Sequence, residues 1–169
     1  MYDVANIGFQ VFEDNKGLGV ASATLPTLTS LLQTINGAGI AGNLESAIIG
    51  HFDVMTLTLN FRTVTRDAIM LAEPRNHTLE LRAAKQNEDT TNGTVEIGSE
   101  KHVFVAFPKT FNAGNMAPAS PAEASGEYSV KYWATYIDGE KVMELDPRNY
   151  ICFINGTDYL EPARKAMGL

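Results

Sequence analysis

Apolar and polar residues alternate at every second position in several segments, and this pattern restricts the fold more than any other feature of the chain. In the clearest segment the apolar members are Met55, Leu57, Leu59 and Phe61, and the polar members are Thr56, Thr58 and Asn60. Successive side chains of a β-strand point to opposite faces, so this segment predicts a strand with one buried and one wet face. The period recurs at Leu79, Leu81 and Ala83, at Val103, Val105 and Phe107, and at Tyr128, Val130, Tyr132, Ala134 and Tyr136.

Turn-forming pairs divide the C-terminal third into short strands. Asp138-Gly139 and Asn155-Gly156 tolerate the positive φ angles of two-residue hairpin turns, and the apolar run 150–154 lies between them. These pairs predict a meander of three antiparallel strands.

Two polar stretches are expected to lie outside the regular strands. Residues 86–94 form an excursion with Asn92-Gly93 at its tip, and the period-free segment 108–126, rich in Ala, Pro, Gly and Ser, is predicted to be a long loop. Strands are predicted on both sides of each stretch, and 169 residues suffice for one hydrophobic core. We therefore predict a single domain, residues 1–169, that is mainly β: two packed antiparallel sheets in a β-sandwich or barrel-like arrangement, with one or two short helices.

Helix signals are few. One short helix has candidate N-caps at Thr63 and Thr65 and a stop at Pro74. A second is predicted to begin near Asp158, which has capping-box spacing to Glu161, or one turn later, because Pro162 suits the first turn of a helix. Gly168 is its expected C-terminal stop.

Composition excludes several classes of protein. The chain has 13 basic and 20 acidic residues and a formal net charge of -7, so its surface as a whole does not attract nucleic acid. No apolar run predicts a membrane span and no basic start precedes an apolar core, so we expect synthesis in a cytosol and no stable membrane insertion. Cys152 is the only cysteine, which excludes an internal disulfide, and its apolar neighbours predict a buried thiol.

The segment TINGAGIAGN at residues 34–43 has the GxGxxG spacing of a dinucleotide-binding loop. Such a site needs a helix after the glycines and an acid about 20 residues later. Here the chain passes directly into the alternating strand that begins at Met55, and no carboxylate stands at residues 57–62. The segment therefore predicts no bound cofactor.

No arrangement of polar residues predicts catalysis. His51, His77 and His102 lie far apart, and only His51 has a carboxylate, Asp53, two residues away on the same strand face. Two such groups do not make a metal site, and no GxSxG-type nucleophile motif occurs. We therefore predict that the protein is not an enzyme and has no catalytic residue, metal or cofactor.

The tyrosines of segment 128–136 have two interpretations. Tyr128, Tyr132 and Tyr136 share one face of a regular strand, with Trp133 on the other. They could line a sugar-binding surface, but aromatic residues at this spacing more often form the core face of a sheet.

Three stretches, taken in order, resemble a known family. Residues 136–169, YIDGEKVMELDPRNYICFINGTDYLEPARKAMGL, contain a Tyr-rich strand, an Ile-Asp-Gly turn, an acidic return strand, an apolar strand and a short closing helix. Residues 6–29 read as an opening hairpin followed by Thr-Leu-Pro, and the glycines of 34–43 follow. This order is similar to that of the major tail tube proteins of contractile-tailed bacteriophages and phage-tail-like bacteriocins. Residues 112–126 depart from the resemblance, since they are longer and richer in Ala and Pro than the family's loop.

The resemblance implies a structural role. Subunits would assemble as hexameric rings that stack into the hollow inner tube of a contractile tail, a conduit driven through the bacterial envelope, with DNA passing through the lumen without specific binding. The implied partners are copies of the chain, the tail sheath protein, a baseplate or initiator complex and a tail terminator. The implied location is the virion tail, after assembly in the host bacterial cytoplasm. A ring in which sheets continue between subunits would also cover sheet edges that otherwise promote aggregation.

Two sets of residues are candidates for the surfaces of such a tube. The glycine-rich segment is predicted to be a hairpin tip or arm that contacts a neighbouring subunit or ring, since glycine permits close backbone approach; its members are Gly37, Ala38, Gly39, Ile40, Ala41 and Gly42. Acids facing the lumen would repel phosphates. The acids on or next to predicted strands are Asp53, Glu80, Glu96 and Glu127.

Two other functions compete with the phage tail tube. The inner tube of a related contractile secretion or bacteriocin system would have the same architecture. A monomeric β-sandwich binding module would use the tyrosine strand for a ligand and would not assemble.

Overall fold

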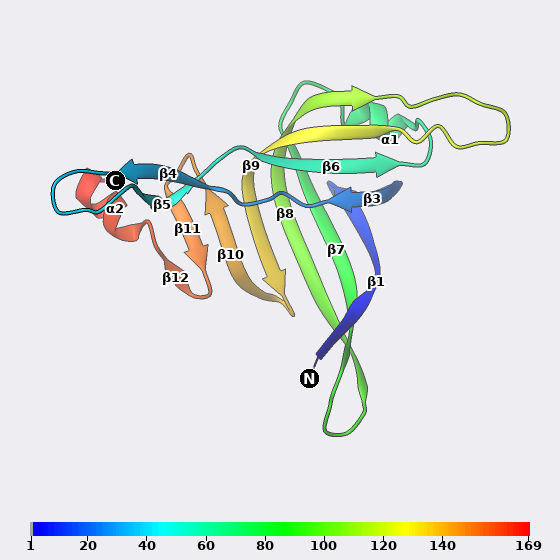
Figure 1. The fold of residues 1–169 in the computed structure, drawn as a ribbon. Coiled ribbons are helices and arrows are strands. Elements are labelled where there is room, and N and C mark those ends of the chain that lie inside the picture. The colour runs from blue at the N-terminus through cyan, green and yellow to red at the C-terminus, as the bar shows by residue number, and fades with distance from the viewer. Residues whose placement is uncertain (1) are drawn as a thin grey trace.

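The alternating segments fold as strands of one large sheet in the computed structural model, which describes residues 2–169 (Figure 1). The strands are β1 (Tyr2–Glu13), β2 (Lys16–Leu18), β3 (Val20–Thr24), β4 (Ser30–Ile35), β5 (Leu44–Phe52), β6 (Met55–Phe61), β7 (His77–Glu88), β8 (Val95–Asn112), β9 (Ser125–Ile137), β10 (Glu140–Asp146), β11 (Ile151–Ile154) and β12 (Thr157–Asp158). The helices are α1 (Arg66–Met70) and α2 (Glu161–Met167). The predicted mainly β fold, with two antiparallel sheets and two short helices, is confirmed.

The two sheets are very unequal, because ten strands belong to one and only β4 and β5 to the other. In the large sheet, one row has the order β12-β11-β10-β9-β8-β7-β1-β2, and β9 also pairs with β6, which carries β3 on its far edge. Residues 125–130 of β9 pair with β6, and residues 133–137 pair with β10. The sheet therefore branches at β9. In Figure 1, β6 runs across the upper parts of β7 and β8, and β3 lies below it.

The core contains the inward side chains of both branches. Its fully buried members include Leu57, Leu59, Phe61, Leu79, Phe104 and Tyr128. In β6 all four alternating apolar residues are buried and the three polar residues between them are half-buried, as predicted. Short helix α1 adds Ala68 to the core, and its N-cap is Thr65, whose hydroxyl accepts a hydrogen bond from the Ala68 amide at 3.2 Å.

A β-bulge in β9 changes which aromatic residues face the core. The register of β8 against β9 shifts by one residue at Lys131. An extra residue reverses the alternation of faces on its C-terminal side. Tyr128 therefore shares the core face with Trp133, whereas Tyr132 and Tyr136 lie on the opposite face. The predicted single face of tyrosines, with Trp133 opposite, is wrong for this reason.

The core face of β8 is also the one that the sequence pattern did not indicate. Val103, Val105 and Phe107 alternate, but they are only half-buried, and the buried face carries His102, Phe104 and Ala106. The His102 imidazole is tolerated in the core because its Nδ1 accepts a hydrogen bond from Trp133 Nε1 at 3.1 Å.

The turns lie largely where they were expected. Asp138-Gly139 and Asn155-Gly156 have positive φ angles and join β9 to β10 and β11 to β12, so the predicted meander is confirmed. Asn92-Gly93 lies in the turn between β7 and β8. The predicted loop 108–126 is too long, because β8 continues to Asn112 and β9 begins at Ser125.

Helix α2 begins two residues later than its capping-box spacing suggested. Leu160 is its N-cap, with no side-chain hydrogen bond, and Gly168 ends it with a left-handed φ of 76°. The Asp158 carboxylate instead accepts hydrogen bonds from the Leu160 amide at 3.1 Å and the Cys152 amide at 3.3 Å, and forms an ion pair with Arg164 at 2.7 Å. Asp158 thus fastens α2 to β11 without capping the helix. Cys152 is buried, as expected.

Acid is expected to weaken this attachment. Partial burial raises the pKa of the Asp158 carboxyl, but the ion pair with Arg164 and the two backbone donors outweigh it, so the pKa lies below its ordinary value. A carboxyl with a lowered folded-state pKa stabilises the fold above its unfolded-state pKa of about 4, and this contribution is lost as pH falls through the folded-state value. Asp158→Asn should cost about 1 kcal/mol at pH 7 and less at pH 3. Urea unfolding at both pH values checks this, and an equal cost at both would contradict it.

Candidate assembly surfaces

Strands β4 and β5 form an arm that is separate from the large sheet. Four cross-strand pairs hold it together, from Leu32 opposite Ala47 to Ile35 opposite Leu44, and residues 36–43 connect the strands. Figure 1 shows this arm beside α2, at one end of the molecule. The predicted glycine-rich hairpin tip is therefore the end of the arm.

The three glycines of the tip are needed for their backbone angles. Gly37, Gly39 and Gly42 have φ angles of 140°, 90° and 110°. Residues other than glycine adopt such angles only with strain. Hydrogen bonds from the Ile40 amide to the Gly37 carbonyl and from the Gly42 amide to the Ile40 carbonyl, both 3.2 Å, shape the turn. Apart from chain neighbours, no atom lies within 4 Å of a Cβ placed on any of these glycines, so there is open space beside each of them.

The arm exposes large apolar side chains on both of its faces. Ile35 and Leu44 form a pair on one face, and Leu32 lies opposite Ala47 on the other. The exposed fractions of Leu32, Leu44 and Ile49 are 56%, 56% and 66%. Exposed apolar neighbours such as Ile35 and Leu44 are typical of sites of protein contact.

The base of the arm is fixed to the C-terminal segment. In β5 the pairing breaks between Phe52, opposite Ser30, and Ala47, opposite Leu32, so residues 48–50 are bulged out. Gly50 has a φ of 69°, and a Cβ at this position would lie 2.5 Å from Cγ of Leu160. The buried Leu160 side chain therefore occupies the space that only glycine leaves, and it joins the arm to the start of α2.

The outer edge of β1 is a second unpartnered surface. Residues 2–10 lie beyond the three residues that pair with β2, so their backbone is paired on the β7 side only. Val4 and Ile7 are the extra residues of two register shifts, and with Tyr2 they are exposed at the edge. A free edge can accept a strand from another chain.

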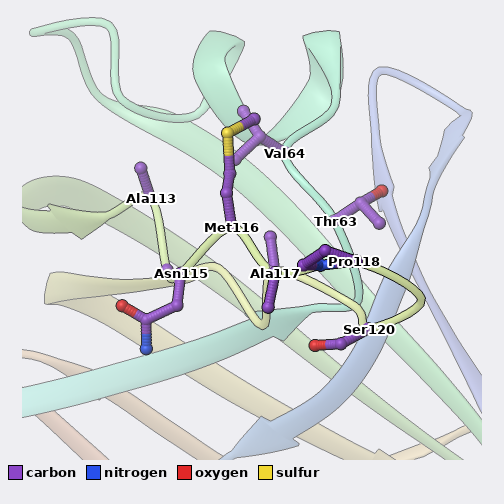
Figure 2. Close-up of a pocket in the computed structure, with 10 residues that line it drawn as sticks. Thr63, Val64, Ala113, Asn115, Met116, Ala117, Pro118 and Ser120 are labelled. Carbon is purple, nitrogen blue, oxygen red and sulfur yellow. The ribbon is translucent and has the colours of Figure 1, made fainter.

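A cavity lies beneath the loop that connects β8 and β9. Its volume is about 720 Å³, and it is lined by Thr63 and Val64 before α1 and by the loop residues 113–118, 120 and 122. Figure 2 shows the Met116 side chain beside Val64, with Ala117 and Pro118 next to it. No periodicity in the sequence could reveal this cavity, because an irregular loop forms its wall.

Comparison with known proteins shows the family of this chain. A family model described as phage tail tube protein FII matches residues 7–168. The chain belongs to this family. It is 27% identical over 155 residues to the tail tube protein of Escherichia phage P2, which covers 89% of this chain and 88% of that protein.

Solved structures show that the fold is shared more widely. The sheath/tube terminator of an extracellular contractile injection system, PVC, has a TM-score of 0.56 at 10% identity, covering 80% of this chain and 98% of that one. A chain of the PVC sheath-tube complex has a TM-score of 0.52 at 11% identity, covering 76% and 87%. A chain of the anti-feeding prophage baseplate has a TM-score of 0.51 at 12% identity, covering 76% and 90%.

The tail tube protein is a structural component of the tube of phage tails. Membership of a structural family weighs against an enzyme. In the part of the chain that the structure describes, no group of three or more His, Cys, Asp or Glu side chains is placed to hold a metal ion. No helix over the same residues is long and apolar enough to cross a membrane.

Each of the three histidines has a ring nitrogen within hydrogen-bond distance of another group of the chain. His77 and His102 are buried and hydrogen-bonded. His51 is exposed, with its Nδ1 2.9 Å from the Ile49 carbonyl oxygen, near the base of the arm.

The four candidate acids of the tail tube protein do not share one face. Glu80 and Glu127 lie on the face of the large sheet that points away from the core. Glu96 lies on the other face of the β7–β8 hairpin, near its tip, and Asp53 lies in the connection between β5 and β6. Glu80 is also paired with Arg82 at 3.2 Å, which offsets its charge. Only Glu80 and Glu127 are brought to one side.

Proposed function

We propose that this tail tube protein assembles into hexameric rings that stack as the inner tube of a contractile tail, and that the arm makes contacts between subunits or rings. The observation that carries the proposal is the arm itself, a hairpin with exposed apolar side chains on both faces and a glycine-rich tip that has open space at its three glycines. A hairpin of this kind is marginal in water and is stabilised by burial against another surface.

The free edge of β1 supports the same proposal. In a closed ring, strand addition between copies would satisfy the unpaired backbone groups of residues 2–10. The remaining partners of the tube would be the sheath protein, a baseplate or initiator complex and a terminator. The tube would reside in the virion tail after assembly in the host cytoplasm.

The lumen would be lined by the face of the large sheet that points away from the core, with DNA passing through without specific binding. Glu80 and Glu127 lie on that face, together with Thr56 and Thr58 of β6. Carboxylates on the wall would repel phosphates over about 8 Å at physiological salt. Asp53 and Glu96 would contribute to this repulsion only if ring stacking brought them to the lumen.

Electron microscopy of the purified protein over a concentration series tests the proposal. Hollow tubes of uniform width, with sixfold end views, are expected, with or without an added initiator complex. Dispersed monomers under all of these conditions would overturn it and favour the monomeric binding module.

The variant Gly39→Val is expected to stop tube growth while leaving the subunit folded. Valine is strained at a φ of 90°, so the tip must change shape, but no core contact is touched. Gly156→Val is the matched control, because Gly156 lies in another open turn with a φ of 87°. Negative-stain images and thermal unfolding of both variants provide the measurement. Normal tube growth by Gly39→Val would contradict a role for the tip in assembly.

A further inference from the structure

We propose that the cavity beneath the β8–β9 loop of one subunit receives the tip of the β4–β5 arm of the next copy in the ring. The inference rests on the proposed assembly and names the surface that the arm contacts. It follows from three features of the molecule: a preformed apolar cavity, an apolar tip at the opposite end, and complementary unpaired charges beside each.

The cavity is held open by backbone contacts at the base of the loop. The Asn115 amide donates to the Ala122 carbonyl at 2.9 Å, and the Glu123 amide donates to the Arg62 carbonyl at 3.0 Å. A Cβ on Gly114 would lie 1.8 Å from the Ala122 carbonyl oxygen, so only glycine permits this close approach. The base of the loop is therefore pinned to the end of β6.

The lining of the cavity suits a small apolar insert. It is formed mainly by Val64, Ala113, Met116, Ala117, Pro118 and Ala122. Met116 is fully exposed, at 100%, although it borders the cavity. Figure 2 shows its flexible side chain extended beside Val64, where it can adapt to an incoming surface.

The tip of the arm is apolar, like the lining of the cavity, and it lies at the other end of the molecule. Its residues between the glycines are Ala38, Ile40 and Ala41, which carry no charge and little bulk. Figure 1 shows the arm and α2 at one end of the molecule and the β8–β9 loop with α1 at the other. A contact between two different surfaces at opposite ends of a subunit repeats from copy to copy, and it generates a ring when the rotation closes.

Charges beside the two surfaces are complementary. Glu45 is the only charged residue of segment 30–50, and it is exposed on the arm. Arg62 and Arg66 flank the two cavity residues before α1, and both are exposed. Among the residues that the structure describes, none of these three forms an ion pair. Glu123 is the acid next to this rim, so two cations there face one carboxylate, and the carboxylate of an arriving Glu45 would balance them.

Disulfide cross-linking of assembled tubes tests the contact directly. Cys152 is replaced by alanine, so that Ile40→Cys on the arm and Met116→Cys on the loop are the only thiols. Oxidation should convert the tube into covalent oligomers up to a closed ring on a denaturing, non-reducing gel. The control pair Ile40→Cys with Thr91→Cys, on the β7–β8 turn, should remain monomeric.

The outcomes separate this inference from the proposed function. Tubes that form but give no Ile40–Met116 cross-link would overturn the cavity as the arm's acceptor and leave the tube intact as a proposal. Absence of tubes from the unsubstituted protein would overturn both.

A charge swap provides a second test that does not depend on thiols. Glu45→Arg alone, and Arg62→Glu with Arg66→Glu, should each raise the critical concentration for tube growth about tenfold, because like charges then meet at the rim. All three substitutions together should restore growth, which a merely misfolded variant would not do. Failure of the triple variant to grow, while its circular dichroism matches the unsubstituted protein, would overturn the contact.

Discussion

Replacing Ile35 and Leu44 by serine is expected to abolish tube growth without unfolding the subunit. The two residues pair across the arm and are 42% and 56% exposed in the free chain, so their loss removes little from the core. Full burial of an exposed apolar side chain contributes about 1.5–3 kcal/mol, and about half of the area of these two side chains is still exposed in the free chain. Losing both would therefore weaken each subunit contact by about 10–10²-fold. Sedimentation of assembled tubes and thermal unfolding of the free subunit measure the two effects.

The arm also supplies the control for this prediction. Gln33 and Ser46 form the next pair on the same face, and both are polar and exposed. Gln33→Ala with Ser46→Ala changes the same hairpin without removing apolar area, so growth should be nearly normal. Unchanged growth by the serine variant would show that the apolar pair is not buried in the tube. Equal loss of growth in both variants would mean that the shape of the hairpin matters more than its apolar surface.

Local sequence patterns predicted the elements whose structure is set by neighbouring residues. The alternation in β6 follows from the pleat, and Asp138-Gly139 specifies its hairpin through backbone angles that few other pairs tolerate. The surrounding segments excluded a nucleotide loop at the glycine tip, and the family resemblance then predicted an arm there. The exposure of its apolar faces could not be predicted, because it depends on the arm lying outside the large sheet.

Features set by pairing between distant strands could not be predicted. The bulge at Lys131 has no local signal, yet it moves Trp133 into the core and Tyr132 out of it. The free edge of β1 depends on where β2 stops pairing. The cavity depends on how the β8–β9 loop is pinned to the end of β6 at Arg62. In each case the sequence defines the segments, and long-range register defines the surface.

A buried ionic cluster is the clearest case of such long-range dependence. Glu13 ends β1 and His77 begins β7, and their exposed fractions are only 4% and 0%. Glu13 Oε1 lies 2.9 Å from His77 Nδ1 and accepts a hydrogen bond from Arg75 at 2.9 Å. His77 Nε2 lies 3.0 Å from the Glu73 carbonyl oxygen. Both ring nitrogens of His77 thus lie within hydrogen-bond distance of an oxygen atom, which holds the ring between the end of β1 and the residues before β7.

Replacing His77 by leucine is expected to cost about 3–5 kcal/mol of unfolding free energy, because it leaves the Glu13 carboxylate buried with Arg75 as its remaining partner. Glu13 Oε2 already has no hydrogen-bond partner among the described residues, so the site has little capacity to compensate. Urea unfolding at neutral pH measures the loss.

The double variant His77→Leu with Glu13→Leu should be more stable than His77→Leu alone, by about 2 kcal/mol. Removing both partners also removes the buried carboxylate that His77→Leu leaves with Arg75 alone, and apolar replacements of a buried pair are often nearly neutral. A double variant that is less stable than either single one would show that leucine packing, and not the stranded carboxylate, causes the loss. Because Glu13 and His77 join the ends of β1 and β7, a stranded charge there would act on the register of the two strands and on the β1 edge that the proposed ring requires.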